Sequence, residues 1–214
     1  MLLSNVIPLS KELALPKTSK HKGWHISQFV ESKSLPWALM GLFIGFTYSG
    51  VLVFIPIELN RMGAGIWGSA FFAIFALIII VSRPLVGKVY ARYGSKFIIY
   101  PGLGLFILGL FGLGLATTPM AIIFTAPLLG LGYGAAQPAF QALAIQSAPI
   151  ERAGVSTATY FLALDISVGA GSIILALLEN ALGYQYLYII AALVMVVALG
   201  LYHVWIKKYT PLEI

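Results

Sequence analysis

Three polar side chains interrupt long uncharged stretches of the chain, and their spacing places them on helix faces. Gln137 and Gln141 are four residues apart, so on a helix they point in the same direction. Asp165 follows Phe161 by the same interval in a later stretch. Amides and a carboxyl group around one cavity can bind a polar solute, and an acid in such a site can exchange a proton. The candidates for substrate or proton binding are Asp165, Gln137, Gln141, Tyr48 and Phe161.

The composition excludes a soluble domain. The chain has 13 Lys or Arg and 7 Asp or Glu among 214 residues, which is 9% charged residues. An average soluble domain has about 25%. Hydrophobic residues make up 60% of the chain, so neither a soluble enzyme nor a disordered chain fits. There is no cysteine, which excludes disulfides and thiolate metal sites, and we expect no metal and no cofactor.

Charge-free stretches predict six membrane-spanning helices, because a bilayer core requires about 20 apolar residues per helix. The longest stretch, 97–150, holds two helices separated by the turn residues Thr117, Thr118 and Pro119. Glycines such as Gly41 and Gly45 should let helices of this kind pack closely. The expected helices cover about 36–57, 66–82, 97–116, 120–146, 154–178 and 186–206.

The basic residues predict the orientation in the membrane. Loops that stay in the cytoplasm are enriched in Lys and Arg. In the six-helix arrangement, every Lys and Arg except Arg61 falls on one side, together with both termini. We expect a multi-pass cell (plasma) membrane protein with a cytoplasmic segment 1–35, a membrane domain 36–206 and a cytoplasmic tail 207–214. Within the first segment, the spacing of apolar residues in 24–30 fits a short amphipathic helix or a disordered basic leader.

A structural role is the alternative for Asp165. No Lys, Arg or His is expected at the same depth in the membrane, so the carboxyl group has no predicted counter-ion. A protonated carboxyl group that hydrogen-bonds to a neighbouring helix would serve as a packing contact. If the faces of the fourth and fifth helices meet, the amides of Gln137 and Gln141 can donate hydrogen bonds to Asp165. Acids inside membranes are nevertheless often functional.

The segment after the second expected helix reads Arg83-Pro-Leu-Val-Gly-Lys-Val-Tyr-Ala-Arg-Tyr-Gly-Ser-Lys96. It resembles the signature cytoplasmic loop of the major facilitator superfamily, in which a glycine, an acid, a base and a second glycine precede further bases. Ala91 stands where the family has the acid, as is common in the second half of such transporters. The residues that match the signature cytoplasmic loop are Gly87, Arg92, Gly94 and Lys96.

The segment 130–171 is similar to the tenth and eleventh helices of bacterial drug exporters of this superfamily. The resemblance implies a fold of twelve helices in two halves, each made of two inverted three-helix repeats. Over about 24–206, this chain resembles a C-terminal half, that is, an all-α membrane protein of six transmembrane helices. The implied function is transport of a small molecule by alternating access, as in a proton-coupled efflux antiporter. The candidate residues above would line its central cavity.

Two other functions are consistent with six helices. One is a half-size transporter that forms a homodimer, so the expected partners are the lipid bilayer, a small-molecule substrate, and either a missing N-terminal half or a second copy. The other is an intramembrane serine protease that uses Ser156 and His203. Both side chains fall near helix ends rather than at a submerged site, so we expect no enzyme activity. The net charge of +6 is explained by the cytoplasmic loops and requires no nucleic acid.

Overall fold

A computed structural model describes residues 29–209, with side chains as far as Trp205. It contains six helices long and apolar enough to cross a membrane, which confirms the predicted number. The expected amphipathic helix at 24–30 lies almost wholly outside the described residues. The elements in chain order are η2 (Ser32–Ser34), α1 (Leu35–Arg61), α2 (Ile66–Tyr93), α3 (Lys96–Leu115), α4 (Pro119–Gln146), η3 (Ile150–Arg152), α5 (Ala153–Leu182) and α6 (Tyr184–Tyr209).

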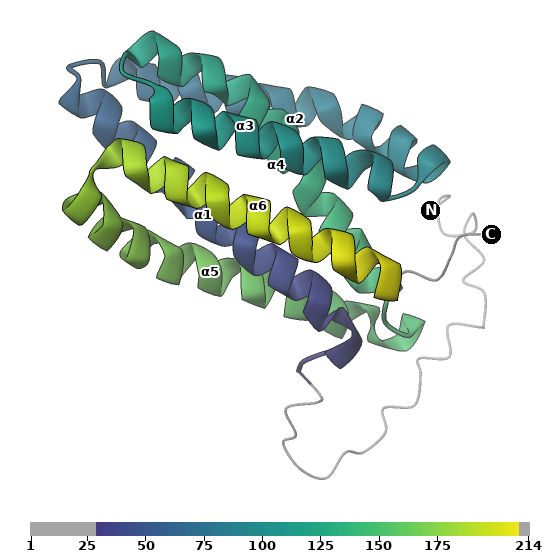
Figure 1. Cartoon of the computed structure of the whole chain (residues 1–214). Coiled ribbons are helices and arrows are strands. Elements are labelled where there is room, and N and C mark those ends of the chain that lie inside the picture. The colour runs from purple at the N-terminus through teal and green to yellow at the C-terminus, as the bar shows by residue number, and fades with distance from the viewer. Residues whose placement is uncertain (1–28, 210–214) are drawn as a thin grey trace, which may run out of the picture.

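Successive helices run in opposite directions (Figure 1). The α2–α3 and α4–α5 connections lie at the same end of the bundle as the beginning of α1 and the end of α6. The α1–α2, α3–α4 and α5–α6 connections lie at the other end. The most extensive contacts join α1 to α5, α3 to α4, and α2 to α4. Of the six helices, α2 and α5 are the least buried.

Close backbone approaches at glycine hold the helices together, as the sequence predicts. A Cβ atom at Gly45 would lie 2.6 Å from the Leu164 carbonyl oxygen of α5. One at Gly132 would lie 2.5 Å from the Phe106 backbone nitrogen of α3. Small residues at these positions allow the close packing that membrane helices use in the absence of a strong hydrophobic drive between them.

The second helix is longer than the sequence analysis predicts. It was expected to end at 82, before the basic residues, but α2 continues to Tyr93 and ends at Gly94, whose φ of 82° favours glycine. The signature segment is therefore mostly helical: Gly87 and Arg92 lie in α2, while Lys96 is the first residue of α3. The charged side chains of the last turns are exposed, so they did not require the helix to stop.

Candidate functional site: a polar cavity between α2, α4 and α5

A cavity of about 590 Å³ lies between α2, α4 and α5. It occupies the half of the bundle nearer the start of α1 and the end of α6, since its lining ends close to the last turns of α2 and α4. Its walls combine polar side chains with apolar ones, as in sites that bind small molecules. The polar side chains that line it are Arg83, Tyr90, Tyr133, Gln137 and Gln141.

Helix α4 supplies most of the polar lining. Tyr133, Gln137 and Gln141 follow one another at intervals of four residues and so share one face, as predicted for the two glutamines. Pro138 has no backbone N–H to donate within α4, and its ring disturbs the helix at this point. The buried Tyr160 hydroxyl of α5 donates to the Gln137 carbonyl oxygen at 2.9 Å and fixes this part of α4.

Tyr48 reaches the cavity only through another residue. Its ring stacks on that of Tyr133, with centroids 4.3 Å apart and planes inclined by 23°. Phe75 of α2 packs beside both rings, with its centroid 6.0 Å from that of Tyr48 and 6.0 Å from that of Tyr133. Tyr48 is not among the lining residues. It packs against Tyr133 from α1 and so supports the cavity wall without lining it.

Phe161 lines the cavity, whereas Asp165 lies one turn further along α5 on an exposed face. Within residues 29–205, no hydrogen bond or ion pair reaches the Asp165 carboxylate, so the bonds expected from Gln137 and Gln141 are not formed. Asp165 therefore lies beside the cavity without a fixed partner in the described part of the chain.

Arg83, Tyr90 and Tyr133 line the cavity and are not among the residues that the sequence predicts for it. The change from an apolar stretch to a basic residue predicts a loop at Arg83, but Arg83 lies inside α2. Val86, Val89 and Tyr90 continue the helical spacing of partly buried residues beyond it, and Gly94 marks the true end of the helix. This spacing and the position of Gly94 could have shown that the helix continues past Arg83 and that Arg83 is part of it.

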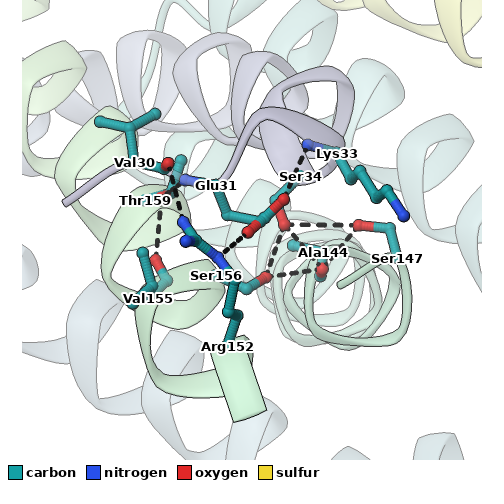
Figure 2. Close-up of polar contacts among 10 residues, drawn as sticks. All are labelled: Val30, Glu31, Lys33, Ser34, Ala144, Ser147, Arg152, Val155, Ser156 and Thr159. Atoms are coloured by element: carbon teal, nitrogen blue, oxygen red, sulfur yellow. Dashed lines mark hydrogen bonds and ion pairs between the residues drawn. The ribbon is translucent and has the colours of Figure 1, made fainter. Parts of the chain in front are cut away.

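A polar cluster at the same end of the bundle joins the start of α1 to the start of α5 (Figure 2). The buried Glu31 carboxylate pairs with Arg152, and the Glu31 backbone N–H donates to Thr159 Oγ1 at 2.9 Å. The Lys33 backbone N–H donates to Glu31 Oε1 at 3.2 Å. This bond, together with the Arg152 guanidinium and against the effect of burial, lowers the pKa of Glu31 below its ordinary value of 4.5.

Three hydroxyl groups complete this cluster around one backbone carbonyl of α4 (Figure 2). Ala144 O accepts hydrogen bonds from Ser34, Ser147 and Ser156 at 2.9, 2.7 and 2.6 Å. Ser34 Oγ and Ser156 Oγ also lie 2.7 Å apart. The cluster thereby holds together the ends of α1, α4 and α5. Two of these helices line the cavity, and α1 supports it through Tyr48.

The serine protease arrangement is not formed. Ser156 Oγ is used in the hydroxyl cluster, and His203 Nδ1 is 2.8 Å from the Tyr100 hydroxyl on α3. The two side chains take part in separate networks, so His203 does not activate Ser156 as a nucleophile.

Comparison with known proteins agrees with this architecture. A family model described as Major Facilitator Superfamily matches residues 4–172. The uncharacterized MFS-type transporter YhhS of Salmonella enteritidis is 26% identical over 223 residues, an alignment that covers 99% of this chain and 52% of that protein. The protein of the same name from Escherichia coli is 27% identical over 180 residues, covering 82% of this chain and 43% of its own. The chain thus spans about half the length of the curated relatives it matches. It belongs to the major facilitator superfamily, a family of membrane transporters.

Proposed function

We propose that this chain is the C-terminal six-helix half of a secondary transporter that moves a small molecule by alternating access, in the manner of a proton-coupled exporter. The observation that carries the proposal is the cavity of about 590 Å³ between α2, α4 and α5. It places amide, phenol and guanidinium groups inside a bundle whose helices are long enough to span a bilayer. Polar groups that line a cavity between membrane-spanning helices are characteristic of substrate pathways.

Inverted three-helix repeats are part of this proposal, and the helix contacts support them. The first repeat would be α1–α3 and the second α4–α6. In such an arrangement α1, α2 and α3 correspond to α4, α5 and α6. The contact of α1 with α5 then corresponds to the contact of α4 with α2, and both contacts are extensive. By the same correspondence, the contact of α3 with α4 matches the contact of α6 with α1, and both pairs of helices are in contact. A transport site is expected where two such repeats meet.

The open faces of α2 and α5 support a second six-helix unit as the missing wall. The α5 face that carries Gly154, Asp165 and Gly169 is exposed, because α5 packs on α1 through its opposite face, which includes Ser167 and Gly171. Ile166, on the open side, is 57% exposed. A crosslinker that joins the I166C thiol at one end and carries a photoreactive group at the other should capture an N-terminal half in native membranes. Capture of a second copy would favour the homodimer, and absence of any product would contradict an assembled cavity.

The proton-coupling role falls to Asp165 in this proposal. It is an acid in the middle of α5, without a fixed partner among residues 29–205, and it lies one turn beyond Phe161 of the cavity wall. Such a group can exchange a proton as its surroundings alternate between wet and closed states. The cytoplasmic placement of both termini is also part of the proposal. It is supported by Lys33, which lies just before α1, and by Lys88 and Arg92 in the last turns of α2. The start of α1 and the end of α2 lie at the same end of the bundle (Figure 1).

Thiol labelling tests the cavity directly, because the chain contains no cysteine of its own. We expect Q137C to react readily with a membrane-impermeant maleimide in membranes, since a cysteine reacts as the thiolate and requires water to ionise. L108C is the matched control, because Leu108 is 59% exposed on α3 and does not line the cavity. If Q137C reacts as slowly as L108C, the cavity is not water-filled and the proposed transport role fails.

A further inference from the structure

A second cavity, of about 680 Å³, lies between the start of α1, the end of α4 and the end of α6, and we call it the end cavity. It is separate from the polar cavity described above, because the two cavities use different faces of α4. Leu143 lines the end cavity, whereas Gln141, two residues earlier on the helix, lines the polar cavity. The end cavity is therefore not part of the proposed transport site.

The lining of the end cavity changes from polar to apolar with distance from the end of the bundle. On the α1 side, Lys33 comes before the helix begins, and the apolar Leu39 lies further in. Helix α4 runs the opposite way and shows the same order, because the apolar Leu143 precedes Gln146 at the end of the helix. A bilayer has this order too, with polar headgroups outside an apolar core. The lining thus matches the polarity of a phospholipid.

Lys33 is the one charged residue among the described residues that line the end cavity. It forms no ion pair with a carboxylate of residues 29–205, because the nearby Glu31 pairs with Arg152. The Lys33 side chain points away from the Glu31 carboxylate (Figure 2). Its ammonium group is therefore left for an anion from outside this part of the chain.

We propose that the end cavity binds one anionic phospholipid, whose phosphate lies at Lys33 and whose acyl chains lie along Leu39 and Leu143. Basic pockets between transmembrane helices bind anionic lipid headgroups, and tryptophan is enriched where a helix meets the membrane surface. Trp205 lines the end cavity at such a helix end. We choose a lipid over a soluble anion because the larger part of the lining is apolar. The inference does not depend on the transport role of the other cavity.

Native mass spectrometry tests the inference by measuring how tightly the purified chain binds phosphatidylglycerol and phosphatidylcholine with the same acyl chains. Attraction of one lysine to an anionic lipid surface corresponds to about a fivefold change in affinity. We expect the unmodified chain to prefer phosphatidylglycerol, K33Q to lose about this factor for that lipid alone, and K33R to retain the affinity. K88Q is the matched control, because Lys88 is an exposed base at the same end of the bundle and lies outside the lining. It should bind phosphatidylglycerol as the unmodified chain does.

Three results would overturn the inference. Equal affinity of the unmodified chain for the two lipids would show that the cavity does not recognise an anionic headgroup. Equal affinity of K33Q and K88Q for phosphatidylglycerol would show that any preference comes from the surface charge of the whole bundle. Displacement of the lipid by millimolar glycerol 3-phosphate would show that the apolar walls contribute nothing and that the occupant is a soluble phosphate.

Discussion

Replacing Gly132 by alanine should destabilise the bundle at the α3–α4 contact. The added Cβ would lie 2.5 Å from the Phe106 backbone nitrogen and 2.7 Å from both the Phe106 Cα and the Gly102 carbonyl oxygen. All three atoms belong to the backbone, so no side chain can move to relieve the contact and the helices must separate. Overpacking of this kind costs about 1–3 kcal/mol. For a domain of this size, each kcal/mol shifts the melting temperature by about 2–4 °C.

G104A is the matched control on the same pair of helices, because a Cβ at Gly104 has no neighbour within 4 Å. Both substitutions gain about 1 kcal/mol of helix propensity, so their difference isolates the contact. The melting temperature of purified G132A in detergent should therefore lie about 2–12 °C below that of G104A. Equal values, or a higher value for G132A, would refute the packing of α3 against α4 described above.

Three further predictions concern orientation, pH and coupling. Reporter enzymes fused after Lys96 and after Asn180 should report opposite sides of the membrane, the first cytoplasmic; the same side for both would contradict the topology. Because the pKa of Glu31 is lowered from 4.5, its ion pair stabilises the fold above that pH, and the stabilisation is lost as pH falls through 4.5 toward the lowered pKa. The melting temperature of the unmodified chain should therefore fall more steeply than that of E31Q between pH 5 and 3, and parallel curves would exclude the effect. D165N should abolish the pH dependence of substrate uptake into vesicles prepared from the organism's own membranes. If the dependence of uptake on pH is unchanged in D165N, Asp165 is a packing residue.

The number of helices and the glutamine face followed from the sequence for simple physical reasons. A bilayer core demands long uncharged stretches, so the six helices are visible as gaps between charges. The interval between Gln137 and Gln141 is fixed by helix geometry, and both residues line the cavity. Tyr133 lies four residues before Gln137 and could have been found by the same reasoning.

Two features could not be read from the sequence with the same rules. Treating a charge as the end of a membrane helix misplaces Arg83, because a helix continues past a cation that faces a polar cavity. The sequence also does not show which face of α5 packs against α1, because two faces of this helix carry small residues. One includes Gly169 and Asp165, the other Ser167 and Gly171, and only the contact with α1 shows which face is buried.

Accessibility of Gln137 from both sides of the membrane tests the transport role most directly. Q137C would be labelled with an impermeant maleimide in sealed vesicles of each orientation, prepared from the organism's own membranes so that any partner half is present. If the cavity belongs to an alternating-access transporter, we expect Q137C to be labelled from both sides of the membrane. Labelling should be slower when a bound solute occupies the cavity. L108C should react from neither side. Labelling of Q137C from one side alone, or from neither, would contradict a transport pathway through this cavity.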